Sequence, residues 1–518
     1  MDLHILFNLT ALAIFLSLIF LFITKWKKSQ TPSERKKLPP SPKQLPIIGH
    51  LHLISLLPHR DFKELAKKHG PIMHLKLGET SAIVISSPEI AKEVLETQDP
   101  TFAERLGTMS SEIVWYNHTD IAFSPYNDYW RQMRKICMLE FLSSKQVRSF
   151  ASIRTDEGLK LIKYIKSSAG IHINLTEKIF LTTSSISARA AFGKICKDKD
   201  TMVKLFQEGV ILAAGFELAD LFPSFKLLRL FSSNKVKLWA MRRKLDPILD
   251  EIIDEHKANL VRMKTDNEVL DQAESIRRGN GELGNEDLVD VFLRVKETGE
   301  LDVPINYDNM KAVFSDIFSA GTNPPSSTID WAMVELIRNP RVMAKAQAEV
   351  RESFKGHEII DDTDLQKLKY LKMVIKETLR MHTLVPLVPR ASRKDSEING
   401  YFIPANAKVL VNAWEMCRDP KYWTNAESFK PERFENNGMD FTGNGHFEYT
   451  PFGSGSRMCP GTTFAIAGVE LLLAQLLYNF NWKLPEGINA DNLEMTEKSG
   501  ITASRKEKLY VIATFYDP

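Results

Sequence analysis

The sequence predicts a mainly helical fold with small peripheral β-sheets. Apolar residues recur at helical spacing through much of the region 58–385, including Val313–Ile337 and Pro340–Phe354. Neither an internal repeat nor a second linker divides the chain after residue 45, so we expect one large domain. The predicted strands are short stretches rich in β-branched and aromatic residues, at Met73–Leu77, Ala82–Ile85, Lys408–Asn412 and Leu509–Thr514.

An apolar N-terminal segment, Leu3–Ile23, is long enough to span a hydrocarbon core of about 30 Å. Basic residues follow it, which places the bulk of the chain on the cytosolic side. A cleaved signal peptide is the alternative, but no clear small-residue cleavage site follows. The sequence therefore predicts a transmembrane signal anchor at 1–24, a basic and proline-rich linker at 25–45, and a catalytic domain at 46–518.

Composition narrows the classes of function. The chain has 68 Lys and Arg against 65 Asp and Glu, which gives no support to nucleic-acid binding. Its cysteines are spread out without a C-x-x-C pair, which argues against structural zinc and disulfides. They are Cys137, Cys196, Cys417 and Cys459.

One cysteine stands in a glycine-spaced loop, Phe452–Gly461, in which Arg457 precedes Cys459 by two positions. A thiolate that ligates haem iron needs a rigid turn with backbone N–H groups free to point at the sulfur. The glycines permit that close approach. The alternative is a buried structural cysteine in a turn.

This loop resembles the haem-binding loop of the cytochrome P-450 superfamily, F-x-x-G-x-R-x-C-x-G, without insertion. The resemblance implies a cytochrome P-450 fold and a haem b cofactor whose iron takes its axial thiolate from Cys459, the metal ligand. Phe452, Arg457 and Gly461 become cofactor-binding residues. It also implies a monooxygenase that uses O₂, a lipophilic small-molecule substrate, and electrons from NADPH through an NADPH–cytochrome reductase.

Three further segments extend the resemblance. Glu377 and Arg380 match the E-x-x-R helix, and Arg433 matches the arginine that completes a buried structural cluster. Trp130 and Arg134 share one helix face and match a W-x-x-x-R segment that contacts a haem propionate. Arg390 resembles another propionate-binding position.

The segment Ala320, Gly321, Thr322 and Asn323 matches the distal helix of the family, and we assign it as catalytic. Asn323 stands where the family has an acid, and Pro324 stands where it has a threonine. Those two side chains relay protons in the family. Two hypotheses follow: ordered water still carries protons, or slowed delivery redirects the chemistry to desaturation, epoxidation or a skeletal or methyl shift.

Several phrases, such as 120–126, 219–224 and 330–335, resemble plant microsomal members of the seventy-one clan, which often oxidise terpenoids. We expect a terpenoid substrate, with a diterpenoid favoured, and a single-pass protein of the endoplasmic-reticulum membrane with a cytosolic catalytic domain. The alternatives are a haem protein without turnover that serves as a membrane-bound partner, and an oxygen-independent isomerase. The apolar segment Val210–Phe231 is either core or a membrane-facing surface beside the substrate entrance.

Overall fold

The computed structural model describes residues 37–517 except 196, 213–216, 268–285, 300 and 363–364. The predicted anchor at 1–24 and most of the linker at 25–45 lie outside these residues. Among the described residues, α19 (Thr462–Asn479) is long and apolar enough to cross a membrane. Most of α19 is buried inside the domain, so its apolar character belongs to the core.

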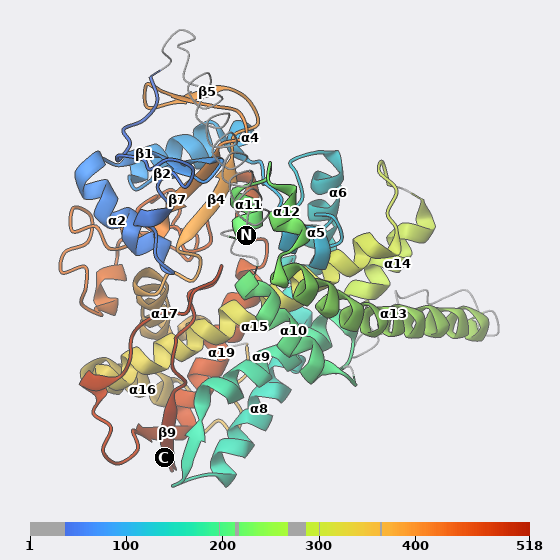
Figure 1. Ribbon diagram of the computed structural model, residues 1–518. Helices are drawn as coiled ribbons and strands as arrows, with labels where there is room; N and C mark the ends of the chain where they lie inside the picture. The colour runs from blue at the N-terminus through green and yellow to red at the C-terminus, as the bar shows by residue number, and fades with distance from the viewer. Residues whose placement is uncertain are drawn as a thin grey trace, which may run out of the picture.

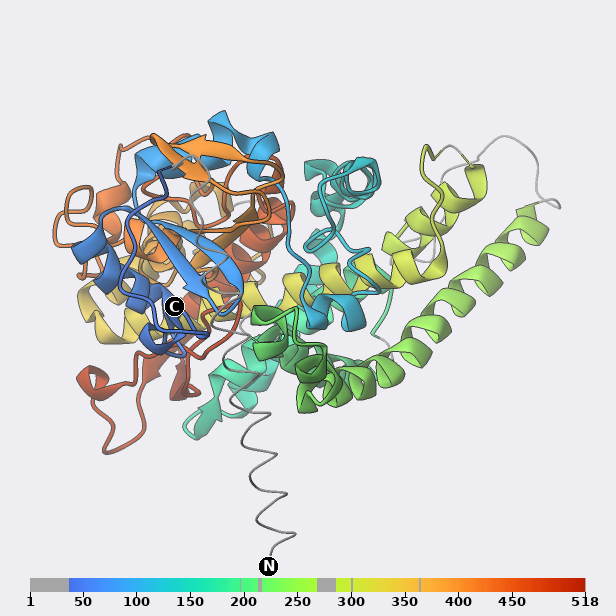
Figure 2. The ribbon, with the colours of Figure 1, turned by 45° about the horizontal axis from the view of Figure 1, so that its top comes forward.

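Helix α15 (Tyr307–Arg338) runs through the middle of the molecule, between the strand-rich part and α13 (Ser233–Asn267) (Figures 1 and 2). The side chain of Asn306 caps its first turn, since the Asn306 Oδ1 accepts from the Asn309 N–H at 2.9 Å. Apolar residues are buried all round the helix, as expected of a core helix. It packs along α9 (Leu175–Phe192) and α19.

The other long helices surround this central group. They are α2 (Pro58–His69), α6 (Asp128–Ile136), α8 (Ala151–Ser167), α10 (Lys199–Leu212), α14 (Leu288–Thr298), α16 (Pro340–Ser353) and α17 (Lys369–Met381). The short helices are α3 (Pro88–Lys92), α4 (Asp99–Phe102), α5 (Met109–Val114), α7 (Ser144–Ser149), α11 (Leu218–Leu221), α12 (Lys226–Leu230) and α18 (Ala413–Met416).

Three small sheets lie at the periphery. The largest has the strand order β1-β2-β7-β4, in which only the β2–β7 pair is parallel. The others have the orders β3-β9-β8 and β5-β6. The strands are β1 (Ile72–Leu77), β2 (Thr80–Ile85), β3 (His172–Asn174), β4 (Leu387–Ala391), β5 (Ser396–Ile398), β6 (Tyr401–Ile403), β7 (Lys408–Asn412), β8 (Phe480–Lys483) and β9 (Tyr510–Phe515).

The predicted fold class, mainly α with small sheets, is confirmed. Val313–Ile337 falls inside α15, Pro340–Phe354 coincides with α16 to within one residue, and the four predicted strand stretches fall on β1, β2, β7 and β9. The helix α15 continues through Pro324 and Pro325. The tertiary contacts along its length outweigh the loss of backbone donors at the two prolines.

The apolar segment that ends at Phe231 is mostly not core. Among its described residues Leu221 is buried, and Phe222 packs against the cluster that contains Leu221. Six large apolar side chains on or next to α11 and α12 are exposed: Leu218, Phe225, Leu227, Leu228, Leu230 and Phe231. The core interpretation is therefore wrong for this stretch, because short helices joined by turns leave these side chains outside the packed helices.

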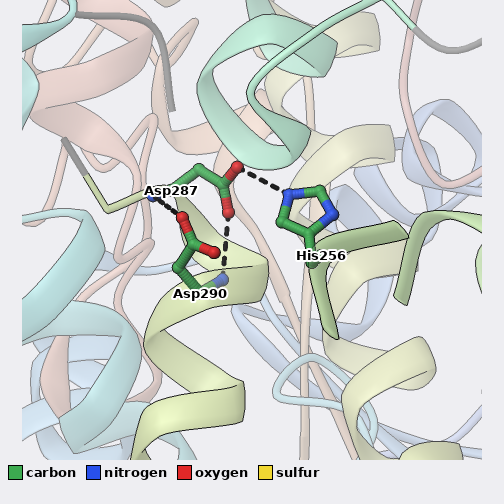
Figure 3. Close-up of side chains that lie close together, drawn as sticks. All are labelled: His256, Asp287 and Asp290. Atoms are coloured by element: carbon green, nitrogen blue, oxygen red, sulfur yellow. Dashed lines mark hydrogen bonds and ion pairs between the residues drawn. The ribbon is translucent and has the colours of Figure 1, made fainter. Parts of the chain in front are cut away.

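Buried polar side chains also join α13 to α14. The His256 ring donates from Nε2 to the Asp287 carboxylate at 2.8 Å (Figure 3). Its Nδ1 donates to the Ile252 carbonyl at 2.7 Å. Asp287 and Asp290 form a capping box at the start of α14. His256, Asp287 and Asp290 lie close enough to hold a metal ion, but these contacts make the group a complete helix-capping cluster.

Candidate functional site

A cavity of about 550 Å³ lies between α15, the loop that carries Cys459 and β4. Most of its lining side chains are apolar, which suits a lipophilic ligand. Representative members are Leu106, Ile121, Ile317, Leu384, Val388 and Ile501. The polar groups of the lining come from several segments, including the cysteine loop and α15.

The cysteine loop has the rigid form that its glycines predict. Gly453 and Gly455 have φ of 70° and 72°, in the left-handed region. A Cβ at Gly455 would lie 2.0 Å from the Leu95 carbonyl oxygen, so the loop passes too close to that backbone for any side chain. The Cys459 N–H donates to the Phe452 carbonyl at 2.9 Å, which closes the turn directly before α19.

The Cys459 thiol lies on the cavity wall. Burial raises its pKa, while the Gly461 N–H, the Thr462 hydroxyl and the charge of Arg134 oppose that rise. All three groups favour the thiolate form of the sulfur. They are the kind of surroundings in which a metal-bound thiolate is held.

Arginine side chains converge on the same end of the cavity. Arg105, Arg134, Arg390 and Arg457 all line it. Burial, together with repulsion from Arg105, lowers the pKa of Arg390 well below its usual range and lowers that of Arg457 to about 9. The Arg390 Nε is buried without a hydrogen-bond partner among the described residues. An anionic group at this place would relieve both the repulsion and the unpaired donor.

The sequence predicted three of these arginines and missed Arg105. Its guanidinium donates to the carbonyls of Ala122 and Pro389 and tethers two segments of the wall. No periodicity or spacing singled it out, because it lies in an irregular segment between α4 and α5. The only local signal is that Arg105 follows the fully buried Phe102 by three residues.

Trp130 lies behind Arg457, which lines the cavity. Its Nε1–H donates to the Ile121 carbonyl at 3.0 Å, and its ring is 4.0 Å from the guanidinium of Arg457. The residue is not part of the cavity lining. The direct propionate bond predicted for Trp130 is therefore not the arrangement found here, because its single N–H is already bonded. Trp130 instead supports Arg457 from behind.

The predicted Glu377 cluster is formed as expected. Arg380 donates to both oxygens of Glu377, at 2.7 and 2.9 Å, and the Arg433 Nε donates to Oε1 at 2.9 Å. The Lys430 N–H adds a fourth bond at 2.8 Å. Glu377 and Arg380 are completely buried. None of the three cluster side chains lines the cavity, so they act on the architecture and not on a ligand.

The distal stretch of α15 divides into cavity residues and helix-facing residues. Ala320, Gly321 and Asn323 line the cavity together with Pro324 and Pro325. Thr322 does not line it: the Thr322 hydroxyl is buried and donates to the Phe318 carbonyl at 2.7 Å. The structure does not place the side chain of Thr322 with the other three, because the helical period turns it away from the cavity.

The serines that follow the prolines do not replace the missing alcohol. Ser326 and Ser327 are absent from the cavity lining, and the Ser326 hydroxyl donates to the Asn323 carbonyl at 2.8 Å. Thr328 does line the cavity, but its hydroxyl is bonded to the Pro324 carbonyl at 2.9 Å. The cavity face of α15 from 320 to 325 thus has neither an acid nor a hydroxyl.

Polar groups that sequence reasoning missed lie beside this stretch. Asp316, earlier on α15, lines the cavity and accepts from the Ile121 and Ala122 N–H groups at 2.9 and 3.0 Å. Burial raises its pKa to about 6, and burial with repulsion from Asp316 raises that of Asp120 further. Ser187 of α9 also lines the cavity. Neither Asp316 nor Ser187 belongs to a spaced motif that would mark it.

The fold and site together define a helical protein with a buried cysteine loop built to receive an anionic, metal-bearing cofactor. Comparison with known families makes this specific. The family described as Cytochrome P450 matches residues 39–511, so the chain belongs to the cytochrome P450 family. This confirms the predicted class, an oxidoreductase of the monooxygenase type, and the predicted cofactor, a cysteine-ligated haem b.

Two plant relatives match over nearly the whole chain. Premnaspirodiene oxygenase of Hyoscyamus muticus is 53% identical over 514 residues, with 99% of each chain covered. The 5-epiaristolochene 1,3-dihydroxylase of Nicotiana tabacum is 51% identical over 516 residues, with 99% of each covered. A solved zebra fish cytochrome P450 with abiraterone aligns with a TM-score of 0.72 at 22% identity, covering 89% of this chain and 100% of that one, and supports the fold.

Proposed function

We propose that this protein is a haem-thiolate monooxygenase that oxidises a lipophilic terpenoid with O₂ and electrons from NADPH supplied by an NADPH–cytochrome reductase. The observation that carries the proposal is the Cys459 thiol on the wall of an apolar cavity, at the end where the arginines converge. When bound, the haem supplies oxygen activation, and the protein supplies the ligand, orientation and electrostatics.

The residues divide the work of holding haem. Cys459 would supply the thiolate ligand to iron and Phe452 would shield the sulfur from water. Gly461 leaves open space, since a Cβ there would meet nothing within 4 Å. Arg105, Arg134, Arg390 and Arg457 are the propionate partners. Trp130 orients Arg457, and the cluster of Glu377, Arg380 and Arg433 fixes the segments that support the loop.

The substrate is proposed from the cavity and the relatives. The lining is mostly apolar, and the two relatives described above are named for oxidation of premnaspirodiene and 5-epiaristolochene. We keep a diterpenoid as the favoured substrate, and the experiment below also tests smaller terpenoids. The exposed apolar side chains of α11 and α12 support docking to the endoplasmic-reticulum membrane, with residues 1–24 as its anchor and the domain from 46 onward in the cytosol.

The distal change supports a second candidate outcome. Asn323 and Pro324 cannot donate a proton from a carboxyl or a hydroxyl, so slowed delivery would favour desaturation, epoxidation or a skeletal or methyl shift. The alternatives of a haem protein without turnover and of an oxygen-independent isomerase stay open to the same experiment. Neither would consume NADPH when substrate is added.

The experiment uses the full-length protein in microsomes with reductase, NADPH and a panel of terpenes. We expect NADPH consumption that depends on substrate, and a new oxidised product that requires O₂. A product formed without O₂ and NADPH would favour the isomerase. Haem binding without any consumption across the panel would favour the partner protein.

A further inference from the structure

Ser187 has a hydroxyl that nothing in the described structure satisfies. It lies on α9, is 2% exposed and borders the cavity, and its Oγ has no hydrogen-bond partner among the described residues. Its neighbours on the same helix behave differently: the Ser184 Oγ donates to the Leu181 carbonyl at 2.8 Å, and the Thr183 Oγ1 donates to the Thr322 carbonyl at 3.2 Å. A buried unpaired hydroxyl costs stability unless a ligand or water satisfies it.

This hydroxyl faces the altered stretch of α15. A Cβ added at Gly321 would lie 2.7 Å from the Ser187 Oγ, so the two helices are in contact at this point. Pro324 and Pro325 have no N–H, and the usual i to i−4 bonds to the carbonyls of Ala320 and Gly321 cannot form. Gly321, whose carbonyl has no helical donor, therefore lies beside a hydroxyl without a partner.

We infer that Ser187, with the Ala320 and Gly321 carbonyls, holds an ordered water that carries protons into the cavity in place of the family's distal acid and alcohol. A buried water needs two to four polar partners, and these three groups would supply them. Ser187 is in this account a positioning residue, since it acts through the water. The inference rests on the proposed haem function.

The stoichiometry shows what the water would control. Oxygenation of a C–H bond takes one O₂, two electrons and two protons, and gives one alcohol and one water. If the protons arrive at the wrong place or time, the same O₂, electrons and protons leave as hydrogen peroxide and the substrate is unchanged. A proton-carrying water at Ser187 favours the first outcome.

The test compares Ser187→Ala with Ser184→Ala in the full-length holoenzyme. Ser184 is the matched control, because it is an equally buried serine of the same helix whose hydroxyl is already bonded. We expect Ser187→Ala to keep its haem content and its thiolate spectrum. Hydrogen peroxide released per NADPH should rise about two- to tenfold, the factor that corresponds to the loss of one hydrogen bond, and Ser184→Ala should change nothing.

Two further readouts separate water positioning from packing. A crystal structure of the holoenzyme should show a water bonded to the Ser187 Oγ, and Ser187→Ala should lose it. Replacement of Pro324 by threonine should restore a hydroxyl to α15, so that Ser187→Ala has a smaller effect in that background. The inference is overturned if the wild-type site is dry, or if peroxide release in Ser187→Ala equals that of the wild type. Loss of the thiolate spectrum in the wild-type protein would instead sink the proposed function.

Discussion

The side of the cavity that carries Cys459 keeps the residues that the family pattern predicts, whereas the α15 side lacks two of them. On the cysteine side, the carboxylate of Glu377 accepts hydrogen bonds from Arg380, Arg433 and the Lys430 backbone. The four arginines that line this end of the cavity are placed to pair with an anion. On the α15 side, the positions of the acid and the alcohol hold Asn323 and Pro324. The difference indicates that assembly of the cofactor site and delivery of protons to it are separable properties of this fold.

The largest expected effect is on the cysteine side. Replacement of Cys459 by serine removes the thiolate, so the reduced protein with carbon monoxide should lose the absorption band of a thiolate haem. Oxidation of terpenes should stop. Cys417→Ser is the matched control, because Cys417 is buried but does not line the cavity. Retention of the thiolate band in Cys459→Ser would assign the ligand elsewhere.

The next effect concerns the buried cluster. Arg380→Ala removes two of the four hydrogen bonds to the buried carboxylate of Glu377 and leaves Arg433 as its one remaining cation, which should lower the free energy of unfolding by roughly 3–5 kcal/mol. Chemical denaturation of the apo- and holoprotein measures it. The control is Glu64→Gln, which removes an exposed i,i+3 pair with Lys67 and should have no measurable effect. Equal free energies of unfolding for Arg380→Ala and Glu64→Gln would contradict the structural role assigned to the Glu377 cluster.

A smaller effect is expected on the α15 side. The double variant with Asn323→Glu and Pro324→Thr restores the acid and the alcohol of the family. The product should stay the same, while hydrogen peroxide released per NADPH should fall about two- to tenfold. A change of product would contradict the water route. It would favour the hypothesis that the prolines redirect the chemistry.

The smallest effect is expected away from both sides, at the pair of His256 and Asp287. Burial alone lowers the pKa of His256, but the hydrogen bond and charge of Asp287 outweigh it, so the pKa is raised above 6.5. The stability that this pair contributes is therefore complete below about pH 6.5 and is lost as pH rises through the raised pKa. His256→Gln should lower the melting temperature most in acid and least in alkali, with the same product at each pH. A loss that is constant with pH would contradict this assignment.

How far the sequence could go depended on whether a feature was local. The cysteine loop, the E-x-x-R pair and the strands are set by residues close in sequence, and they could be predicted. That Thr322 faces away from the cavity could not be predicted, because a motif carries no information on which face of α15 lines the cavity. Arg105 and Ser187 were missed since their roles arise only when distant segments meet: Arg105 joins the Ala122 and Pro389 carbonyls, and Ser187 meets Gly321.

The sequence also could not show that the side chains of α11 and α12 are exposed. The run of apolar residues up to Phe231 fits a core segment and a surface patch equally well in sequence. Only the tertiary arrangement, in which Leu221 is buried while Phe225 and Phe231 are exposed, decides between them.

The most direct test of the account is an oxygen-18 experiment. Microsomal holoenzyme with reductase and NADPH would be given its terpene substrate under labelled O₂, and the product mass would be read. The account predicts a hydroxylated product that carries one labelled oxygen atom, formed without an acid at 323 or an alcohol at 324. A desaturated or rearranged product without label, formed only with O₂ and NADPH, would contradict it and show that the Asn323-Pro324-Pro325 stretch diverts the substrate away from oxygen insertion.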